Sequence, residues 1–298
     1  GGARDSEHTP SATPGGALIG RVSSRTRVLA LLGDPVDHSL SPVIQNAAFE
    51  AADVDGVYVA LRCSQEDLPH LMRGISEAGG GGNVTLPHKE RAAAVVNAPT
   101  AAVRRTGACN TFWRTGDGRI HGDNTDVEGF IRALRAFIGR PPKGERVLLL
   151  GAGGAARAAL VGLLDDGARE VLILNRSTER ARAVARRIGG ERVRVADGPR
   201  SVEGADFDLV INATRLGLEP DDPLPLQLDR LHRVGAVMDL VYGPEKTPFV
   251  RAAETYGVRA TDGGEMLVQQ GAVAFERWWG REAPLPAMKD ALEAHRVG

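Results

Sequence analysis

The chain has 298 residues, 42% of them hydrophobic and 25% charged, and a formal net charge of −1. This composition is typical of a soluble globular protein, and the length suggests two domains at about 150 residues each. The near-neutral charge argues against a broad electrostatic nucleic-acid binder, and no apolar run approaches the ~18 residues of a membrane-spanning helix. The two cysteines, Cys63 and Cys109, have neither a metal-binding spacing nor a disulfide framework, which favours a reduced, cytoplasmic setting and no metal site.

The first part of the chain divides into an extension and an α/β domain. Residues 1–25 are rich in small residues and proline and lack apolar periodicity, which predicts a flexible extension without the apolar core of a signal peptide. Residues 26–123 alternate short apolar runs with helical patterns, which predicts a parallel α/β layer. We expect strands at 28–33, 57–61 and 83–86, helices at 43–52, 66–78 and 89–96, and a hairpin joining 111–114 to 119–121.

A second domain is expected over residues 124–262. We expect strands at 146–150, 170–174, 209–212 and 236–240, and helices at 157–164 and 178–188. This repeated alternation is typical of a doubly wound, Rossmann-type nucleotide-binding sheet. Residues 263–298 are helical in pattern and contain Phe275, Trp278 and Trp279, so we expect them to pack back on the first domain.

A glycine-rich turn links a predicted strand of the second domain to the next helix. Gly151 and Gly153 allow a tight turn and close approach of a pyrophosphate, and the helix offers free N–H groups and a favourable dipole. Gly154 and Ala155 continue the turn, and the small Ala156 takes the third place of the fingerprint. The strand–turn–helix context favours a dinucleotide cofactor over a purely structural turn.

The end of the following strand favours NADP(H) over NAD. An NAD binder usually has Asp or Glu about 20 residues after the glycine turn, where the carboxylate holds the ribose 2′-hydroxyl. This chain has Asn175, Arg176 and Ser177 instead. No carboxylate repels a 2′-phosphate there, Arg176 and Arg180 can clamp it, and Ser177 or Thr178 can donate to it. The alternative is that both arginines are solvated charges in an arginine-rich chain.

Lys89 is the most unusual cation of the chain. Of the 37 basic residues only four are lysines, and Lys89 follows a polar segment that contains Asn83 and Thr85. A buried amine, unlike a guanidinium, can exchange its proton, so a scarce lysine in this setting indicates chemistry. Taken alone, it is also explained as an exposed surface lysine.

Further polar residues lie where the fold has no need of them. Ser39 and Ser41 place two hydroxyls at i and i+2, and in an extended stretch both point the same way, which suits a carboxylate. Alternatively, Ser41 is only a helix cap. Asn110 and Asp126 lie near glycines at predicted strand ends, a common address for sites in α/β proteins. Asp126 can also be read as a cap of the helix that follows.

Together these segments resemble the shikimate dehydrogenase family. The resemblance covers residues 28–280, and the joint order and spacing of its motifs are highly specific. The motifs are Gly33-Asp34-Pro35-Val36, Ser39-Leu40-Ser41-Pro42, Asn83-Val84-Thr85-Leu86-Pro87-His88-Lys89, Gly107-Ala108-Cys109-Asn110-Thr111, Asn124-Thr125-Asp126, Gly151-Ala152-Gly153-Gly154-Ala155, Asn175-Arg176-Ser177, Asn212-Ala213-Thr214, Asp239-Leu240-Val241-Tyr242 and Gln269-Gln270-Gly271-Ala272. Cys109 and Ser177 depart from the commoner pattern without removing a site group.

The resemblance implies a two-domain enzyme that reduces 3-dehydroshikimate to shikimate with NADPH, a step of chorismate and aromatic amino acid biosynthesis. It implies that Lys89 and Asp126 form the catalytic acid–base pair. The implied substrate-binding residues are Ser39, Ser41, Thr85, Asn110, Tyr242 and Gln270. The implied cofactor-binding residues are Gly151, Gly153, Gly154, Ala155, Asn175, Arg176, Ser177, Arg180, Thr214 and Gly263. The expected partner is the small-molecule substrate, and a homodimer stays open.

Three other functions stay open on the sequence. A quinate or aminoshikimate dehydrogenase would differ in one or two polar contacts with the substrate. A non-catalytic NADP-binding regulatory protein would use the same fold, but the full set of site side chains argues against it. A methylene-tetrahydrofolate dehydrogenase is a related two-domain enzyme, and the paired serines at 39 and 41 fit it less well.

Overall fold

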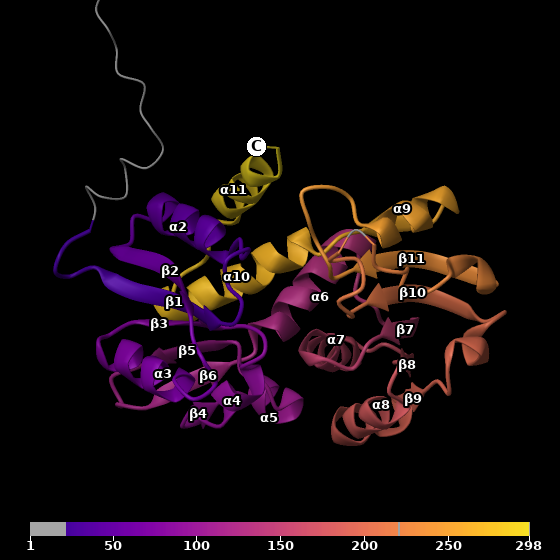
Figure 1. The fold of residues 1–298 in the computed structure, drawn as a ribbon, viewed down its shortest axis with the longest axis horizontal. Helices are drawn as coiled ribbons and strands as arrows, with labels where there is room; N and C mark the ends of the chain where they lie inside the picture. The colour runs from indigo at the N-terminus through magenta and orange to yellow at the C-terminus, as the bar shows by residue number, and fades with distance from the viewer. Residues whose placement is uncertain (1–21, 220, 298) are drawn as a thin grey trace, which may run out of the picture.

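Two sheets form the framework of the molecule. The computed structural model describes residues 22–219 and 221–297, and within them it contains two six-stranded sheets flanked by helices (Figure 1). The predicted α/β class is therefore confirmed. The extension predicted over residues 1–25 lies outside the described residues as far as residue 21.

The first sheet is mixed. Its strands are β1 (Arg27–Gly33), β2 (Gly56–Arg62), β3 (Gly81–Val84), β4 (Ala98–Pro99), β5 (Thr111–Arg114) and β6 (Ile120–Asp123). Its helices are α2 (Ser41–Ala51), α3 (Leu68–Glu77), α4 (Lys89–Ala93) and α5 (Ala101–Thr106). In the order β2-β1-β3-β5-β6-β4, β1 is parallel to both neighbours and β5 is antiparallel to both of its own. The predicted parallel layer and the predicted hairpin are thus both present.

The second sheet is parallel throughout. Its strands are β7 (Arg146–Leu150), β8 (Glu170–Leu174), β9 (Val193–Val195), β10 (Asp206–Asn212), β11 (Arg233–Asp239) and β12 (Arg259–Thr261). The helical segments around it are α6 (Thr125–Ile138), α7 (Gly154–Asp165), α8 (Thr178–Val184), η1 (Ala185–Gly189), η2 (Gly190–Arg192), η3 (Pro199–Val202), η4 (Leu228–Arg230) and α9 (Pro248–Thr255). The order β12-β11-β10-β7-β8-β9 reverses direction at β7, as in doubly wound nucleotide-binding sheets.

The central strand β7 is apolar from Val147 to Leu150 because both of its faces are covered. In β7, Val147 and Leu149 belong to one core cluster, whereas Leu148 and Leu150 belong to the cluster on the opposite face. A strand buried on both sides needs continuous apolar sequence rather than alternation. This is why the run at residues 146–150 predicts its strand so well.

The C-terminal helices return to the first sheet. They are α10 (Gly264–Trp279) and α11 (Leu285–Val297), and α10 crosses the middle of the molecule to reach the first half (Figure 1). Phe275 and Trp278 of α10 and Met288 of α11 share a core cluster with Leu29 of β1. The Trp278 indole also donates to the Phe112 carbonyl at 3.3 Å. The predicted packing of this tail on the first half is therefore confirmed.

The outer edge of β2 is closed by one side chain. Asn46 of α2 donates to the Tyr58 carbonyl and accepts from the Tyr58 N–H, both at 2.9 Å. Because β2 is the edge strand of its sheet, these two backbone groups face away from β1. The amide of Asn46 thus satisfies the middle of an otherwise open edge.

The two halves of the molecule are joined by the close approach of α6 and α10. A Cβ placed on Gly129 would lie 2.5 Å from the Gln270 backbone nitrogen, so only glycine permits this contact. The next residue, Phe130, points into the core cluster beneath the second sheet. Helix α6 therefore packs on the second sheet through one face and on α10 through another.

Several of the expected element boundaries were wrong. The helix expected at 43–52 begins at Ser41, and its N-cap is Leu40, without a side-chain cap bond in the described residues. The reading of Ser41 as a helix cap is thus wrong, because the residue lies inside the first turn. The helix expected at 89–96 ends at Ala93, after which Val95 and Val96 turn into the core.

The strand expected at residues 83–86 occupies Gly81–Val84 instead. Its glycines are part of the strand because a Cβ on Gly82 would lie 2.0 Å from the Ala30 carbonyl oxygen, and one on Gly81 would lie 2.6 Å from the Phe112 carbonyl oxygen. They mark close backbone approach rather than a chain break.

Substitution of Gly129 tests the helix contact. We expect Gly129→Ala to lower the free energy of unfolding by about 1–3 kcal/mol, because the added methyl group overpacks the α6–α10 contact. The matched control is Gly74→Ala in α3, where an added Cβ meets nothing within 4 Å of the described structure. Better helix propensity should make that variant more stable by about 0.5–1 kcal/mol. Equal urea-denaturation midpoints for the two variants would contradict the role of Gly129.

Candidate active site

Lys89 and Asp126 form a partly buried ion pair where the two halves meet. The Lys89 Nζ atom lies 2.6 Å from Asp126 Oδ2, and the two side chains are 19% and 9% exposed. The interpretation of Lys89 as a surface lysine is therefore wrong. In such a pair each partner offsets much of the cost of desolvating the other.

Asn110 orients the carboxylate of this pair. Its Nδ2 donates to Asp126 Oδ1 at 2.9 Å, while its Oδ1 accepts from the backbone N–H of Thr125 at 2.8 Å. Asn110 thus satisfies the start of α6, and the hydrogen bonds of Asp126 go to Lys89 and Asn110. Asp126 also lies in the first turn of α6, where the helix dipole stabilises negative charge.

The backbone around Lys89 is held from two sides. The Lys89 carbonyl accepts from the Cys109 N–H at 2.8 Å, and the His88 ring nitrogen Nε2 lies 2.8 Å from the Cys63 carbonyl oxygen. Burial raises the pKa of the Cys109 thiol to about 12, so this thiol stays neutral beside the ion pair. These contacts fix the start of α4 and so the direction of the lysine.

Ser39, Ser41 and Thr85 lie on neighbouring loops at one end of the first sheet. The Ser39 hydroxyl accepts from the Ser41 N–H at 3.2 Å, which is a turn, so the extended stretch expected there was wrong. A Cβ on Gly33 would lie 2.4 Å from Thr85 Cγ2, and the Ser39 N–H bonds to the Val36 carbonyl of the same loop. Both segments therefore border the same end of β1 and β3.

Gln270 and Tyr242 come from the other side of the molecule. Gln270 is half-buried against Gly129, one helical turn beyond Asp126 on α6, and its Nε2 donates to the Leu267 carbonyl at 2.9 Å. Burial raises the pKa of the Tyr242 phenol, an effect that the Arg296 guanidinium partly opposes. The structure thus brings Gln270 to the helix that carries Asp126, whereas Tyr242 lies on the loop between β11 and α9.

The glycine turn opens directly towards Lys89. Gly151 has φ +111°, and a Cβ there would lie 2.8 Å from the Ala213 carbonyl oxygen. A Cβ on Gly153 would meet nothing within 4 Å in the described residues, and one on Gly154 would lie 3.9 Å from Lys89 Cδ. Helix α7 begins at Gly154 rather than at 157 as expected, so Gly154 and Ala155 are its first residues.

This turn fits a dinucleotide pyrophosphate. The N-cap of α7 is Gly153, whose lack of a side chain leaves the first N–H groups of a twelve-residue helix without a side-chain cap among the described residues. Those groups and the helix dipole attract an anion, and open space at Gly153 lets it approach. The residues present therefore accommodate the group that the motif predicts.

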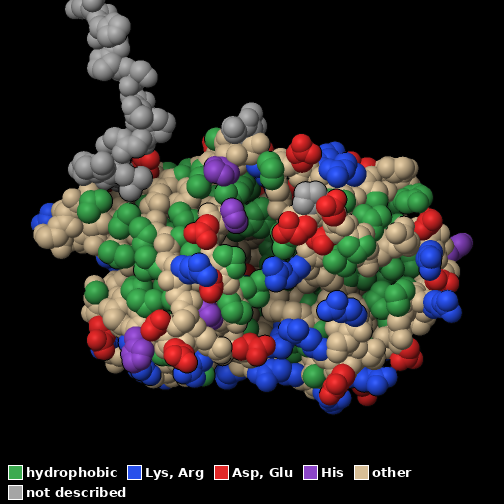
Figure 2. All heavy atoms as spheres, viewed as in Figure 1, with side chains coloured by type: hydrophobic (Ala, Val, Ile, Leu, Met, Phe, Trp, Pro, Cys, Tyr) green, Lys and Arg blue, Asp and Glu red, His purple; other side chains and the backbone are tan. Residues whose placement is uncertain are grey.

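The end of β8 carries the residues expected to bind a 2′-phosphate. The Ser177 hydroxyl accepts from the Arg180 N–H at 3.3 Å and caps α8, while Asn175 Nδ2 donates to the Ser177 carbonyl at 2.8 Å. Arg176 and Arg180 are exposed and make no ion pair within residues 22–219 and 221–297. Two unpaired guanidinium groups thus flank the strand end. Figure 2 shows a hollow between the two halves, with Lys and Arg side chains gathered beside it.

Comparison with known proteins agrees with this geometry. The family model of the shikimate dehydrogenase substrate binding domain matches residues 31–112, that of shikimate / quinate 5-dehydrogenase matches 136–216, and that of the shikimate 5′-dehydrogenase C-terminal domain matches 263–293. A shikimate dehydrogenase (NADP(+)) from Methanopyrus kandleri is 40% identical over 284 residues, 92% of this chain and 97% of that one. The chain belongs to the shikimate dehydrogenase family.

Solved members of the family have the same fold. A shikimate dehydrogenase in complex with NADP⁺ is 34% identical, with a TM-score of 0.85 over 93% of this chain and 98% of that one. The enzyme from Thermus thermophilus, in complex with NADP(H) and shikimate, is 38% identical, with a TM-score of 0.81 over 90% of this chain and 98% of that one. The arrangement of the two sheets described above is thus that of the family.

Two absences concern only part of the chain. Across residues 22–219 and 221–297, no three His, Cys, Asp or Glu side chains are grouped so that they could hold a metal ion. Over the same residues, every helix is too short or too polar to cross a membrane.

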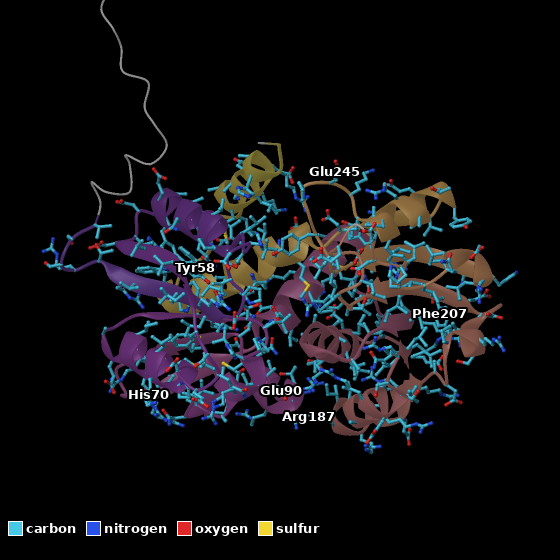
Figure 3. All side chains as sticks on the ribbon, viewed as in Figure 1. Tyr58, His70, Glu90, Arg187, Phe207 and Glu245 are labelled. Carbon is cyan, nitrogen blue, oxygen red and sulfur yellow. The ribbon has the colours of Figure 1, made fainter. Side chains whose placement is uncertain are left out.

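Sequence reasoning missed a contact between the halves beside the Lys89–Asp126 pair. Arg157, in the first turn of α7, lies 2.8 Å from the carboxylate of Glu90, the residue after Lys89. Arg187 donates to the Arg105 carbonyl at 3.1 Å, and Figure 3 places Glu90 and Arg187 at the boundary between the halves. The only signal in the sequence was an arginine in the first turn of the helix after the glycine turn. Its partner, Glu90, could not be identified because it comes from a distant part of the chain.

It also assigned no specific contact to two buried polar residues at adjacent strand ends. Asn212 ends β10 and Asp239 ends β11, both are fully buried, and Asn212 Nδ2 donates to Asp239 Oδ1 at 2.8 Å. Burial raises the pKa of Asp239 to about 6, although hydrogen bonds from Thr247, Val241 and Asn212 oppose the rise. The signal in the sequence is a polar residue that directly follows each of two apolar strands.

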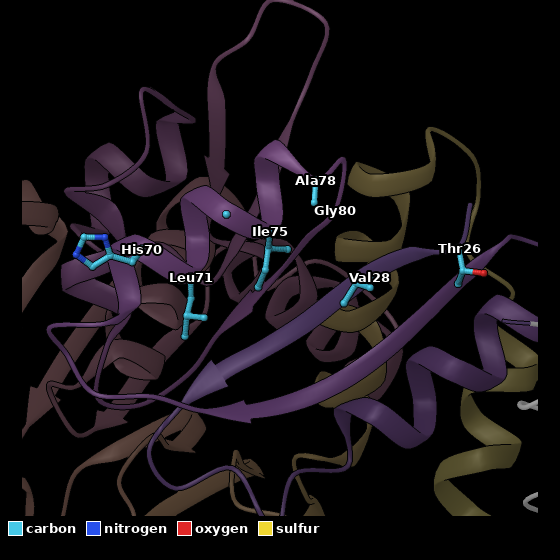
Figure 4. Close-up of a pocket in the computed structure, with 8 residues that line it drawn as sticks. Thr26, Val28, His70, Leu71, Ile75, Ala78 and Gly80 are labelled. Carbon is cyan, nitrogen blue, oxygen red and sulfur yellow. The ribbon is translucent and has the colours of Figure 1, made fainter. Parts of the chain in front are cut away.

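Two cavities are not lined by the residues of the Lys89–Asp126 pair. One, of about 480 Å³, is lined by Ser64, Gln65, Glu66 and Arg91. The other, of about 400 Å³, lies between α3 and β1 and includes Val28, His70 and Ile75 (Figure 4).

The raised pKa of Asp239 predicts a specific pH dependence of stability. Its folded-state pKa of about 6 lies above the ordinary value of 3.8, so the folded state binds the proton more tightly and stability is lost as pH rises between these values. We expect wild type to lose up to about 3 kcal/mol relative to Asp239→Asn between pH 4 and pH 7. Urea denaturation across this range measures the difference, and a pH-independent gap would contradict it.

Proposed function

We propose that the protein reduces 3-dehydroshikimate to shikimate with NADPH, the reversible reaction of chorismate and aromatic amino acid biosynthesis. The observation that carries this proposal is the 2.6 Å Lys89–Asp126 pair, whose lysine stem lies beside the glycine turn of α7. A proton donor held there serves a ketone that meets a dinucleotide bound at the turn. The names of the relatives, shikimate dehydrogenase (NADP(+)), support the same assignment.

The chemistry requires a hydride on the carbonyl carbon and a proton on its oxygen. Bound NADPH supplies the hydride. Lys89 Nζ stabilises the negative charge that develops on the oxygen and gives its proton to that atom. Asp126 holds Nζ in position, and because the Lys89 side chain is 19% exposed, solvent can return the proton to the amine. In the reverse direction the neutral amine accepts the proton of the hydroxyl.

The polar groups around the pair form the substrate site in this proposal. The Ser39 and Ser41 hydroxyls bind the substrate carboxylate, and Thr85, Tyr242 and Gln270 hold the carboxylate or the ring hydroxyls. Asn110 has a narrower role than expected, because one of its N–H groups and its carbonyl are already engaged by Asp126 and α6. It acts chiefly by orienting Asp126, with its remaining N–H available to the substrate.

The cofactor site in this proposal extends along one edge of the second sheet. The pyrophosphate lies on Gly151, Gly153, Gly154 and Ala155, where uncapped N–H groups face open space. Asn175, Arg176, Ser177 and Arg180 read the 2′-phosphate, and Thr214 and Gly263 border the nicotinamide end. For Gly263 packing is a further reason for glycine, since a Cβ there would lie 2.3 Å from the Leu240 carbonyl oxygen.

The domain assignment follows from these roles. We propose a substrate domain over residues 26–123, an NADP domain over 124–262 and C-terminal helices over 263–298 that complete the substrate domain. Helix α6 is the shared element, because it packs on the second sheet and places Asp126 against the first. A cytoplasmic location is proposed from the two free, buried cysteines, and a homodimer remains a prediction that sedimentation can check.

Quinate is the second candidate substrate. The family model that matches residues 136–216 describes shikimate / quinate 5-dehydrogenases. Quinate carries the same carboxylate and similar ring hydroxyls, so Ser39, Ser41 and Lys89 could serve it without rearrangement. The two substrates are separated by the ratio of their kcat/KM values with the same cofactor.

The proposed function is tested by reduced-nicotinamide absorbance with shikimate or quinate and NADP or NAD. We expect the highest kcat/KM with shikimate and NADP. Lys89→Ala should lower kcat by at least about a hundredfold while NADPH binding, followed by fluorescence, is retained. Lys89→Arg should fail similarly because a guanidinium does not give up its proton. Lys143→Ala is the control, and activity with no pair of substrates, or normal turnover without Lys89, would refute the proposal.

The proposed 2′-phosphate site is tested at Arg176. Loss of a charge-assisted hydrogen bond of about 1.5–3 kcal/mol predicts that Arg176→Ala raises KM for NADPH about ten- to a hundredfold, with KM for the substrate little changed. The matched control is Arg182→Ala on α8, the helix that begins two residues after Arg176, because Arg182 pairs with exposed Asp197 at 3.3 Å. An equal rise of both KM values in Arg176→Ala would exclude a direct role at the phosphate.

A further inference from the structure

The ends of β10 and β11 are cross-linked by a buried amide–carboxylate pair. Asn212 and Asp239 are register partners in the parallel ladder, and both are fully buried. Asn212 Nδ2 donates to Asp239 Oδ1 at 2.8 Å, and the Asn212 backbone carbonyl accepts from the Leu240 N–H at 2.9 Å. The link therefore lies where two loops leave the same edge of the second sheet.

Asn212 shapes the loop on the cofactor side. Its Oδ1 accepts from the Thr214 N–H at 3.0 Å and from the Thr214 hydroxyl at 2.7 Å, and its Nδ2 also donates to the Leu216 carbonyl at 3.1 Å. A Cβ on Gly151 would lie 3.3 Å from Thr214 Cγ2, so this loop packs directly on the glycine turn. One side chain thus sets the position of Thr214 against the turn.

Asp239 shapes the loop on the substrate side. Its Oδ1 accepts from the Val241 N–H at 3.0 Å, and its Oδ2 accepts from the Thr247 hydroxyl at 2.6 Å. These two bonds hold both ends of the segment that carries Tyr242. The Val241 carbonyl in turn accepts from the Gly263 N–H at 3.0 Å, just before α10 begins.

A buried carboxylate is energetically unfavourable if its role is only to link two strands. Burial of an unpaired carboxylate is unfavourable, and no Lys, Arg or His in the described part of the chain makes an ion pair with Asp239. The charged group that acts on it electrostatically is Asp262, which is also an acid. What the carboxylate provides is the capacity to accept from Asn212, Val241 and Thr247 together.

We propose that Asn212 and Asp239 form a positioning unit that sets the distance between the cofactor loop and the substrate loop, and so between hydride donor and ketone. The proposal rests on the function proposed above. Neither residue touches the reacting atoms. Both act through Thr214 on one side and Tyr242 on the other, across a single hydrogen bond.

The test compares two truncations with a conservative variant and a packing control. Asp239→Ala should raise KM for NADP and for shikimate about tenfold each and lower kcat, because the side chain that links the cofactor loop to the substrate loop is removed. Asp239→Asn should restore most of the activity, since its Oδ1 can still accept from Asn212 and Val241 while its Nδ2 donates to the Thr247 hydroxyl. Val237→Ala, two residues earlier in the core of β11, should lower Tm but leave both KM values unchanged.

Asn212→Ala supplies an independent readout. It leaves the bonds of Asp239 to Val241 and Thr247 in place, so it should raise KM for NADP about tenfold and KM for shikimate much less. The double variant should be less impaired than the sum of the two single effects predicts, because each single variant already removes the bond between Asn212 and Asp239. If Asp239→Ala does not fold, the KM values of Asn212→Ala and of Asp239→Asn, each compared with wild type and with Val237→Ala, still test the proposal.

Two outcomes would overturn the proposal. One is that Asn212→Ala and Asp239→Ala lower Tm as Val237→Ala does without changing either KM. The other is that Asp239→Asn is as impaired as Asp239→Ala, which would assign the effect to charge rather than to position. If wild type shows no turnover of shikimate, the proposed function fails, and NADP binding by calorimetry to wild type and Asn212→Ala then tests the cofactor arm by itself.

Discussion

The close packing of α6 against α10 at Gly129 is the constraint on which the rest of the molecule depends. Because no side chain separates the two helices there, Gln270 of α10 lies one turn from Asp126 of α6. Helix α10 is anchored in the core of the first half, and α6 in the core of the second. The contact between α6 and α10 therefore connects the two cores, and each of the two helices carries a proposed site residue.

The electrostatics of the site follow from partial burial. The Lys89 side chain of the pair is partly exposed to solvent. The second oxygen of the Asp126 carboxylate accepts a hydrogen bond from Asn110, so both side chains have a partner. Around the cofactor turn the charges are arranged differently: backbone N–H groups at Gly153 and exposed guanidiniums near β8 attract an anion without burying any charge in advance. The proposed site of proton transfer is thus a partly buried ion pair, whereas the proposed phosphate site consists of exposed positive groups.

Apolar runs and glycine spacing predicted the strands and turns whose formation depends on residues close together in the sequence. The run at residues 146–150 and the turn after it were identified correctly, because continuous apolar sequence and glycine spacing report burial and backbone shape directly. The strand at Gly81–Val84 was expected two residues too late, because the atoms that require Gly81 and Gly82, such as the Ala30 carbonyl, come from another strand. Lys89 and Asp126 are 37 residues apart, and only the family resemblance paired them before the structure did. The Asn212–Asp239 bond had no comparable signal, because two polar residues after two strands do not say that they touch.

The amide of Asn46 has a consequence for how copies of the chain can meet. It occupies the N–H and C=O of Tyr58 at the centre of β2, the positions that an incoming strand would need to extend the sheet. Sheet extension through this edge is a general route to intermolecular assembly and aggregation. While α2 stays in place, a second copy of the chain cannot pair its backbone with Tyr58, so this part of the β2 edge is closed to sheet extension between two chains.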